Sequence, residues 1–337
     1  MTTQTTTSTR ELTFAEALRE ALHEEMARDE RIIVLGEDVG AWGGVFRVTE
    51  GLYDKFGPDR VVDTPISEEG FTGLAVGAAM TGLHPVVEIM FGDFITLAMD
   101  QIVNQAAKMR YMSGGQAKVP ITIRATTGSG RSSGGQHSQT MHTWFAHAPG
   151  LKVVYPSTPY DAKGLLKTAL REENPVVFFE DKLMYAKFKG QVPKDEYTIP
   201  FGKADVKRAG SDVTIIATAR MVYAALEAAK TLAEEGIQAE VIDPRTLVPL
   251  DRETLIQSVI KTQRAVIVDQ GYIDYGVTAE LAATIYAGAF DYMEAPIERL
   301  AAPQVPIPFS PPLEFSTIPD PQAVIAAVRR TLEGRGA

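Results

Sequence analysis

The sequence predicts an α/β protein with two domains, each built on a mainly parallel sheet flanked by helices. Short apolar runs alternate with helical patterns along the chain, an arrangement typical of parallel sheets covered on both faces. The length of 337 residues suits about two domains of ordinary size. The alternation breaks once, at the charged and proline-containing stretch 190–200 (GQVPKDEYTIP), and then restarts.

The elements of the first domain are expected from apolar runs and from helical spacing. Strands are predicted at residues 32–35, 86–90, 120–124, 152–155 and 176–180. Apolar residues at helical spacing over 94–111 predict one helix, which Gly114 and Gly115 stop. Further helices are expected over 71–83 and 161–171.

The second half repeats the alternation. Strands are predicted at 213–217, 240–242, 265–268 and 297–300, and helices at 222–235, 252–261, 278–286 and 321–332. The proline-rich stretch 303–312 is expected to be a loop that wraps over the domain before the last helix. We therefore expect a disordered tail over residues 1–10, a first domain over 11–190, a linker over 191–201 and a second domain over 202–337.

Composition excludes several classes of protein. The formal net charge of −10 argues against a nucleic-acid or anionic-membrane binder, whose affinity depends on a basic surface. The absence of cysteine excludes disulfides, thiolate zinc sites, iron–sulfur ligation and cysteine nucleophiles. The first ten residues are polar, and the long, largely apolar uncharged run 70–87 is interrupted by glycines and Pro85. We expect no secretory signal, no membrane span and a cytoplasmic location.

The most unusual local segment is 128–139 (GSGRSSGGQHSQ), which directly follows a predicted strand. It contains neither a P-loop nor a GxGxxG motif, so nothing in it is specific for phosphate. Composition alone favours a flexible connection. Gln136, His137, Ser138 and Gln139 nevertheless place four hydrogen-bonding side chains at the carboxyl end of a strand, where open α/β sheets bind ligands.

Three of the five histidines, His137, His142 and His147, fall close together. Their spacing of five residues does not keep one helix face, and no carboxylate accompanies them at ligand spacing, so a metal cluster is the less favoured interpretation. His137 is the candidate for handling protons, because imidazole changes charge near neutral pH. Structural roles are expected for His142 and His147.

Residues 63–71 (DTPISEEGF) carry the adjacent carboxylates Glu68 and Glu69. Adjacent side chains diverge, so one can enter a cleft and be desolvated, which would raise its pKa, while the other stays in water. From the residues alone, solvated side chains are favoured for both. No GxSxG elbow and no HExxH motif occurs. The local motifs therefore indicate where a site lies without naming a reaction.

A resemblance supplies the reaction. From about residue 12 to 332 the chain resembles the β subunits of the thiamine-diphosphate-dependent decarboxylating component of 2-oxo acid dehydrogenase complexes, in their pyruvate, branched-chain and acetoin branches. The matching segments are GEDVG (36–40), GGVFRV (43–48), DTPISEEGF (63–71), GAAMTGL (77–83), MSGG (112–115), QHSQ (136–139), HAPGLKVV (147–154), DAKGL (161–165), NPV (174–176) and EVIDPRT (240–246). DPRT stands where the family pattern expects DLRT, outside the catalytic segments. The resemblance implies a thiamine-diphosphate-binding pyrimidine domain followed by a transketolase C-terminal-like domain.

The same resemblance implies roles for four side chains. Glu68 corresponds to the acid that pairs with the aminopyrimidine N1′ of thiamine diphosphate, which requires a protonatable carboxyl within hydrogen-bond reach. Phe94 corresponds to the aromatic residue that packs on the pyrimidine ring, and Met90 lines the same pocket. His137 corresponds to the active-centre histidine, which stabilises charged intermediates and transfers protons during acyl transfer to a lipoyl group.

Some members of the family also bind a monovalent cation, potassium, through backbone carbonyls. The matching positions here are Ile121, Ala169, Glu172 and Asn174, and the ion would brace their loop. Carbonyl ligands leave no side-chain pattern, so this assignment depends on the resemblance alone.

The family's motif for Mg²⁺ and the diphosphate begins Gly-Asp-Gly, and the nearest string here, Gly36-Glu37-Asp38, does not match it. The resemblance therefore implies that this chain holds only the pyrimidine half of the cofactor and that a separate α subunit supplies Mg²⁺ and the diphosphate half. We expect an α2β2 heterotetramer whose active site lies at a subunit interface. The second domain is where the dihydrolipoyl acyltransferase core of the complex would dock.

The expected function is that of the β subunit of a pyruvate dehydrogenase, which oxidatively decarboxylates its 2-oxo acid substrate and reductively acylates a lipoyl group. The β subunit of a branched-chain 2-oxo acid or acetoin dehydrogenase is the alternative within the class. A non-catalytic scaffold that docks the acyltransferase is the alternative from another class, and the presence of both Glu68 and His137 argues against it. A single-chain transketolase-like synthase is disfavoured by the missing metal motif and the short length.

Overall fold

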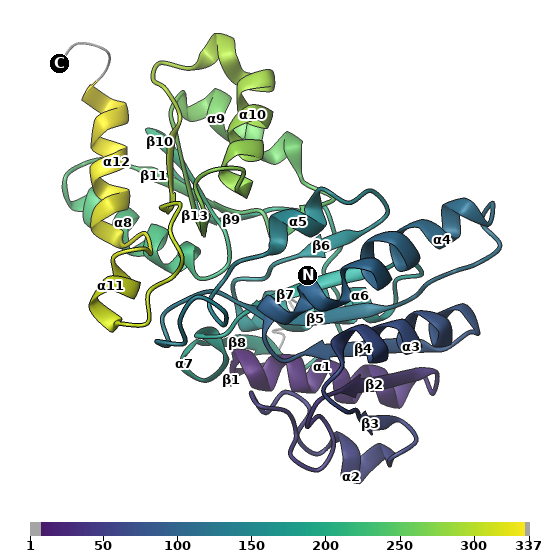
Figure 1. Ribbon diagram of the computed structural model, residues 1–337. Helices are drawn as coiled ribbons and strands as arrows, with labels where there is room; N and C mark the ends of the chain where they lie inside the picture. Colours follow the sequence, from purple (N-terminus) through teal and green to yellow (C-terminus); the bar gives the residue numbers. More distant parts are fainter. Residues whose placement is uncertain (1–7, 334–337) are drawn as a thin grey trace, which may run out of the picture. The chain divides into compact units, whose positions relative to one another are not determined.

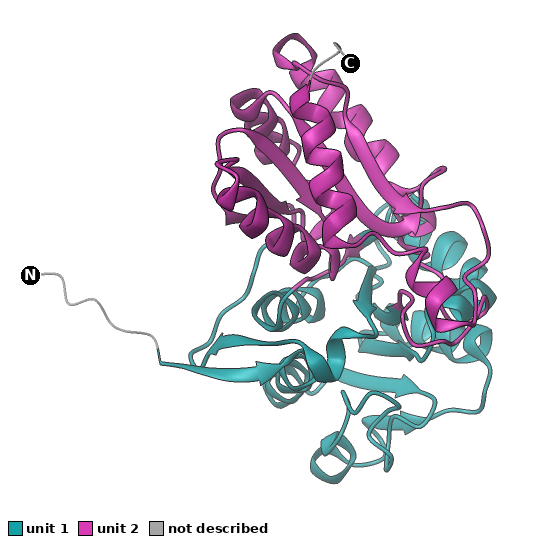
Figure 2. Cartoon of the chain, turned by 90° about the vertical axis from the view of Figure 1, so that its left-hand side faces the viewer, with its two compact units in different colours: residues 1–126, 148–152, 158–200 teal, residues 127–147, 153–157, 201–337 magenta. Residues whose placement is uncertain are grey.

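The chain folds into two compact units, which Figure 2 colours separately. The computed structural model describes residues 8–333. The first unit comprises residues 1–126, 148–152 and 158–200, and the second comprises 127–147, 153–157 and 201–337. Two stretches that the sequence analysis assigns to the first domain, 127–147 and 153–157, thus belong to the second unit.

A sheet whose strands run in the order β7-β5-β4-β2-β3 forms the centre of the first unit (Figure 1). Its strands are β2 (Ile32–Gly36), β3 (Val61–Asp63), β4 (His84–Ile89), β5 (Thr122–Thr127) and β7 (Val176–Asp181). Strand β2 pairs in parallel with β3 and β4, and β4 pairs in parallel with β5. Both faces of a parallel sheet are buried, which explains why its strands are nearly continuous apolar runs in the sequence. The parallel pairing confirms the predicted fold class.

Eight helical segments accompany this sheet in the described part of the first unit. They are α1 (Phe14–Arg28), α2 (Leu52–Phe56), α3 (Glu68–Met80), η1 (Gly92–Ala98), η2 (Asp100–Ala106), α4 (Ala107–Met112), α6 (Pro159–Leu170) and α7 (Met184–Lys187). Helix α1, which the sequence analysis does not single out, begins with a capping box in which Thr13 and Glu16 bind each other's backbone N–H groups. On its inward side, Glu24 binds Lys163 at 2.7 Å and Lys167 at 2.6 Å, two lysines of α6 whose side chains are fully buried.

The prediction of one continuous α-helix over 94–111 is wrong, because the segment is helical but changes its helix type twice. The segment consists of a 3₁₀ helix (η1), a π-helical stretch (η2) and a short α-helix (α4). Ile95, Ile102 and Ala106 are buried as the spacing predicts. Apolar periodicity reports which side chains face inward, and a chain that winds more tightly and then more loosely keeps nearly the same average period.

The second unit contains a sheet in the order β14-β13-β10-β11-β9. Its strands are β9 (Asp205–Arg208), β10 (Val213–Ala217), β11 (Ala239–Asp243), β13 (Ala265–Tyr272) and β14 (Glu298–Ala302). All neighbours pair in parallel except β9, which is antiparallel to β11. The strand predicted at 213–217 is confirmed to the residue.

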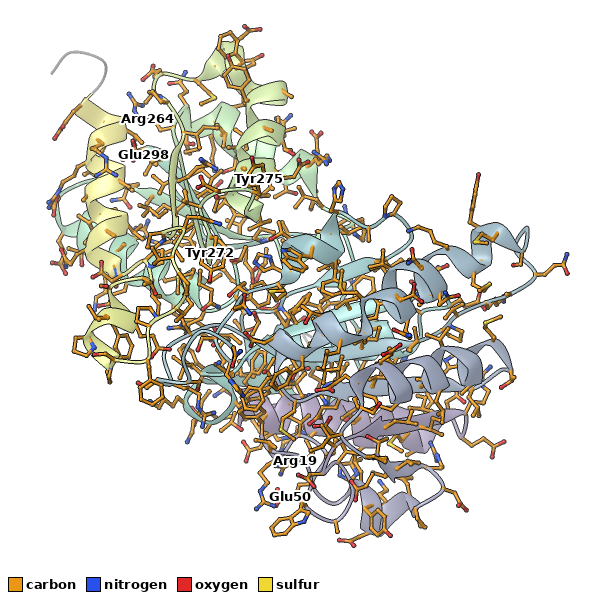
Figure 3. All side chains as sticks on the ribbon, viewed as in Figure 1. Arg19, Glu50, Arg264, Tyr272, Tyr275 and Glu298 are labelled. Atoms are coloured by element: carbon orange, nitrogen blue, oxygen red, sulfur yellow. The ribbon has the colours of Figure 1, made fainter. Side chains whose placement is uncertain are left out.

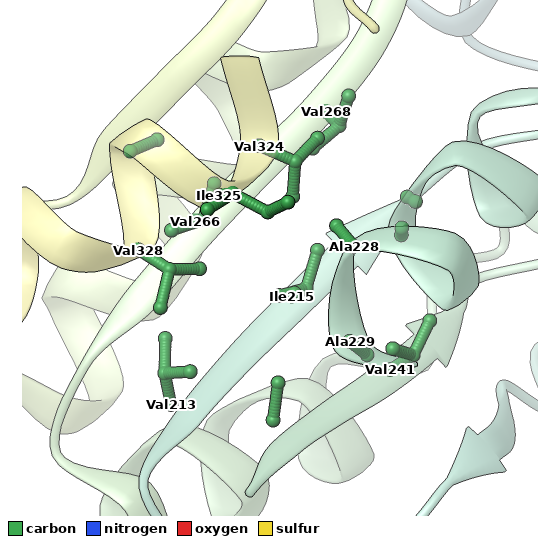
Figure 4. Close-up of a cluster of buried hydrophobic side chains, with 14 of the residues drawn as sticks. Val213, Ile215, Ala228, Ala229, Val241, Val266, Val268, Val324, Ile325 and Val328 are labelled. Carbon is green, nitrogen blue, oxygen red and sulfur yellow. The ribbon is translucent and has the colours of Figure 1, made fainter. Parts of the chain in front are cut away.

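Helices cover both faces of this sheet. They are α8 (Met221–Glu234), α9 (Arg252–Thr262), α10 (Val277–Ala289), η3 (Phe290–Tyr292) and α12 (Pro321–Glu333). Val213 and Ile215 of β10 pack with α8 and α12 in one buried cluster (Figure 4). Thr214, which alternation turns to the opposite face, bonds Ser258 and Thr262 of α9 at 2.6 and 2.7 Å.

Strands β1 and β8 overlap the stretches that the sequence analysis expects to be the disordered tail and the linker. The expected linker is partly a strand, because β8 (Lys189–Pro193) pairs antiparallel with β1 (Thr9–Thr13). The predicted tail over residues 1–10 lies outside the described residues up to position 7, and its last two residues belong to β1. In the second unit, β12 (Thr246–Val248) pairs antiparallel with β6 (Lys152–Val154), and the short helices α5 (His142–Ala146) and α11 (Pro311–Phe315) belong to loops. Of the helices in residues 8–333, none has the length and apolar character needed to cross a bilayer.

Candidate functional site

The carboxyl edge of the first unit's parallel sheet brings two predicted site residues, Glu68 and Met90, together with Glu37, which was not predicted. Glu37 directly follows β2, and Met90 directly follows β4. Glu68 begins α3, five residues after β3 ends. Parallel pairing of β2 with both neighbours brings all three to the same edge, which is where open α/β sheets bind ligands.

Glu68 is buried, with 6% of its surface exposed, whereas the adjacent Glu69 is exposed. As the first residue of α3, Glu68 lies at the positive end of a helix, which favours a carboxylate. The solvated state that the residues alone favour for Glu68 is therefore wrong. Glu68 and Glu69 point in different directions, one inward and one to solvent, because successive positions on a helix are rotated by about 100°.

Glu37 is a site residue that the sequence analysis missed. Burial, and then the charge of Glu68, raise the pKa of the Glu37 carboxyl. Its Oε1 atom is buried and has no hydrogen-bond partner among the described residues. Burial and the nearby charge of Glu68 thus disfavour the ionised form of Glu37. GEDVG gave no local signal for this, because the burial of Glu37 and the proximity of Glu68 depend on neighbouring segments of the fold.

Phe94 and Met90 are half-buried at this edge. Phe94 makes an edge contact with Phe91 at 6.3 Å between ring centroids, and Phe91 makes another with Phe46 at 6.1 Å. Phe46 in turn stacks on Tyr185 at 4.7 Å. These four rings form a continuous apolar row, of which the sequence analysis identified only Phe94.

Two residues of α1, Arg19 and His23, bind the segment that carries Phe46, and His23 Nε2 lies 3.3 Å from the Glu50 carbonyl oxygen. The Arg19 guanidinium forms an ion pair with Glu50 at 2.8 Å (Figure 3) and donates to the Arg47 carbonyl. At the other end of the row, a Cβ on Gly92 would lie only 2.1 Å from the Thr126 carbonyl oxygen. Glycine is therefore required where the chain leaves β4 and passes close to β5.

A buried ion cluster lies beneath the aromatic row. Arg124 of β5 donates two hydrogen bonds to Glu180 of β7, both at 2.7 Å, and one to Glu88 of β4 at 2.5 Å. The Tyr185 hydroxyl donates to Glu180 at 2.6 Å. Burial by itself lowers the pKa of Arg124, but the charges of Glu180 and Glu88 outweigh it and raise that pKa overall. The positive charge of Arg124 compensates the carboxylates of Glu88 and Glu180, which in turn stabilise the buried guanidinium.

The four positions implied in potassium binding meet at one corner of the first unit. The Ile121 carbonyl accepts from the Val176 N–H at 2.9 Å, and the Ala169 carbonyl accepts from Glu172 at 3.2 Å. The Glu172 carboxylate accepts from the Asn174 amide at 2.6 Å. Potassium at this corner stays a prediction. Across residues 8–333, no group of three or more acidic or histidine side chains is arranged to hold a metal ion.

His137 belongs to the second unit, so the structure does not bring it together with Glu68 within one unit. It is half-buried, and its backbone N–H donates to the Gly134 carbonyl at 3.3 Å. Nearby in sequence, His142 is fully buried, with Nε2 3.2 Å from the Asp269 carboxylate. Burial would raise the pKa of Asp269, but His142 and two further donors lower it. His142 thus forms a structural pair.

Comparison with known proteins agrees with the fold. The family described as "Transketolase, pyrimidine binding domain" matches residues 10–187, and "Transketolase, C-terminal domain" matches residues 202–324. Among solved structures, a chain described as "Split gene transketolase, inactive beta4 tetramer" superposes with a TM-score of 0.75 at 25% identity, covering 96% of this chain and 99% of that one.

Curated relatives match over almost the whole length. The acetoin:2,6-dichlorophenolindophenol oxidoreductase subunit beta of Bacillus subtilis (strain 168) is 48% identical over 335 residues, 96% of this chain and 98% of that one. The 2-oxoisovalerate dehydrogenase subunit beta of the same organism is 46% identical, covering 96% and 99%. The pyruvate dehydrogenase E1 component subunit beta of Rickettsia felis is 48% identical, covering 95% and 98%.

The ion cluster predicts a large stability effect. Arg124→Met should lower the free energy of unfolding by about 3–5 kcal/mol, because it leaves the buried carboxylates of Glu88 and Glu180 without their cation. Urea denaturation measures the change. Arg329→Met, which removes an exposed ion pair with Glu235, is the matched control, with an expected loss under about 1 kcal/mol. Equal losses in the two variants would contradict the structural role of the cluster.

The raised pKa of Glu37 predicts a pH-dependent effect. A carboxyl whose pKa is higher in the folded than in the unfolded chain stabilises most below its unfolded pKa, and that contribution is lost as the pH rises through the folded value. Glu37→Gln should therefore gain stability relative to wild type as the pH rises from about 4 to about 8. Urea denaturation across this range measures it, with the exposed Glu69→Gln as control. A difference that does not change with pH would refute the raised pKa of Glu37.

Proposed function

Because the chain belongs to the family of β subunits of thiamine-diphosphate-dependent 2-oxo acid dehydrogenases, we propose that it acts with an α subunit to decarboxylate pyruvate oxidatively. In this proposal the acyl group then passes to a lipoyl group. The family that the sequence predicts is confirmed by the comparisons. The choice of pyruvate as the substrate is a further part of the proposal. It accords with the pyruvate dehydrogenase β subunits among the relatives, at 45–48% identity.

The observation that carries the proposal is the buried Glu68 carboxyl at the sheet edge, with the Glu37 carboxyl close enough to feel its charge. Thiamine diphosphate, when bound, supplies the electron sink that stabilises the charge left on carbon when CO2 departs. The residues present fit its pyrimidine ring. A buried carboxyl suits a ring nitrogen that exchanges a proton, and the unpaired Oε1 of Glu37 provides a further acceptor.

Each side chain at this edge has a distinct task in the proposal. Glu68 holds and moves the proton at the ring nitrogen, and Glu37, whose pKa burial raises, lies close to it as a further polar group. Phe94 and Met90 provide apolar walls that orient the ring and exclude water. His137, from the second unit, handles protons when the acyl group moves to the lipoyl group.

The metal ions and partners belong to the proposal as well. We assign Mg²⁺ and the diphosphate to the α subunit of an α2β2 assembly, since this chain lacks the Gly-Asp-Gly motif. Potassium is assigned to the carbonyls of Ile121, Ala169, Glu172 and Asn174. The second unit is assigned the docking of the dihydrolipoyl acyltransferase core, and the cytoplasmic location stays a prediction.

Acetoin is the second candidate substrate, because two acetoin:2,6-dichlorophenolindophenol oxidoreductase β subunits match at 48% identity over 335 residues. A branched-chain 2-oxo acid is the third, supported by the 2-oxoisovalerate dehydrogenase β subunit at 46%. A purely structural subunit is disfavoured, because it would not need a buried glutamate at the ligand-binding edge of the sheet.

Reconstitution tests the function directly. The purified chain alone should bind thiamine diphosphate and Mg²⁺ weakly in calorimetry. With the α chain it should bind tightly and reduce an artificial electron acceptor with pyruvate, more than about tenfold faster than with acetoin or a branched 2-oxo acid. Faster turnover with acetoin would move the assignment to the second candidate. Tight Mg²⁺-dependent binding by the lone chain would refute the division of the site.

Glu68→Gln tests the proton-transfer role. The amide has nearly the same shape and cannot exchange a proton, so decarboxylation should fall by about 10²–10⁴-fold while assembly with the α chain is retained. The reconstituted enzyme, assayed with an artificial acceptor, measures this. Glu69→Gln, one residue away and exposed, is the matched control and should keep near-normal turnover. A Glu68→Gln enzyme as active as its control would exclude Glu68 from the chemistry.

A further inference from the structure

The second unit contains a buried carboxylate that the proposed chemistry does not use. Glu314 lies in α11, and none of its surface is exposed. Its Oε1 accepts from the Gly130 N–H at 2.6 Å, and its Oε2 accepts from the Ser132 N–H at 2.7 Å. A buried carboxylate is stable only with such donors. These donors come from the glycine-rich loop 128–139, about 180 residues earlier in the chain.

The loop presents these N–H groups because of its unusual backbone. Gly128, Gly130, Ser132 and Gly134 all have positive φ angles, of 90°, 111°, 53° and 73°, and alternate with residues that do not. This alternation turns successive N–H groups to one side and creates a concave anion site, or nest. Ser132 lacks the freedom of glycine, so this conformation requires an external partner. The anion in this nest is a side chain of the same chain.

The same loop carries His137. The two ends of the loop are joined by hydrogen bonds to the Gln139 carbonyl, which accepts from the Gly128 N–H at 3.3 Å and from the Thr127 hydroxyl at 3.1 Å. Its tip turns at Gly134, whose carbonyl accepts the His137 N–H at 3.3 Å. The backbone position of His137 is therefore set by the turn that directly follows the two residues bound to Glu314.

The segment before α11 also lies along this tip. A Cβ on Gly134 would meet the Phe309 ring at 3.6 Å, and one on Gly135 would meet the Ile307 carbonyl at 3.8 Å. Arg220 binds the Ser129 carbonyl at 3.0 Å from another side. The flexible connection that composition favours for 128–139 is thus wrong, because the loop is attached at its base, its centre and its tip.

We propose that Glu314 is a positioning residue for His137: its carboxylate orders the centre of loop 128–139 and thereby fixes the His137 backbone for the acyl-transfer step. The inference rests on the proposed function for the step in which His137 acts. It assigns a purpose to the proline-rich segment 303–317, which brings Glu314 to the loop.

Hydrogen exchange provides a readout that is independent of activity. In the full-length chain assembled with its α subunit, Glu314→Ala should speed amide exchange of residues 134–139 by about tenfold. Glu314 accepts hydrogen bonds from Gly130 and Ser132, so the loss of these bonds by itself accounts for faster exchange at 130–132 and not at 134–139. Faster exchange confined to 130–132 would overturn the proposal. Glu227→Gln, an exposed carboxylate of α8, is the control and should leave the loop unchanged.

Kinetics test the link to His137. Glu314→Ala should slow the overall rate with lipoyl acceptor by about tenfold or more and change turnover with an artificial acceptor far less. Combined with His137→Ala, it should add little further loss, because both variants disable one unit. Fully additive losses would overturn the positioning role. Glu314→Asp, which keeps the charge on a shorter side chain, should recover part of the rate.

The hydrogen-exchange and kinetic experiments together distinguish failure of the proposed function of His137 from failure of the positioning role of Glu314. If His137→Ala leaves acyl transfer unchanged, the proposed function of His137 is wrong, and the exchange measurement still decides whether Glu314 orders the loop. If Glu314→Ala fails to fold, Glu314→Gln replaces it, because the amide retains one acceptor and loses the charge. The Gln variant should show a smaller acceleration in the same residues 134–139, and unchanged exchange there would overturn the proposal.

Discussion

The ion cluster around the buried guanidinium of Arg124 is the interaction on which the candidate-site edge of the first unit depends. Arg124 joins carboxylates from the two neighbouring strands, Glu88 of β4, which is 7% exposed, and Glu180 of β7, which is fully buried. Ion pairs of this kind contribute little net stability compared with apolar packing, but they become strongly unfavourable when one partner is missing. The cluster therefore specifies the alignment of these strands at the end where the ligand-binding residues follow.

The aromatic row continues this alignment outward. Tyr185 donates to Glu180 and stacks on Phe46, so the ion cluster and the row share one side chain. Phe91 and Phe94 extend the row along the chain that leaves β4. The apolar walls of the site are consequently connected to a charged interior, and a shift of one strand would displace both.

Carboxylates that bind backbone N–H groups shape the functional loops of both units. In the first unit, Asp63 accepts from the Gly40 N–H at 2.7 Å, and a Cβ at Gly40 would lie only 2.5 Å from that carboxylate. In the second unit, Glu314 does the same for Gly130 and Ser132. Glycine-rich segments without regular hydrogen bonding gain their order from such side chains, since the backbone donors would otherwise be left without partners. A glycine-rich composition thus indicates close approach as readily as flexibility.

The sequence by itself determined the two α/β domains, most strands and helices, and the family, because β-branched runs, helical periodicity and ordered motifs are local properties. The resemblance also assigned roles to Glu68 and His137, and these roles stay predictions. Only the tertiary structure decided that Glu68 is buried while Glu69 is not, that burial raises the pKa of Glu37, and that Glu314 binds the loop of His137. The winding of 92–112 was likewise decided there. Burial, pKa shifts and loop order arise from contacts between segments far apart in the chain, which no local pattern encodes.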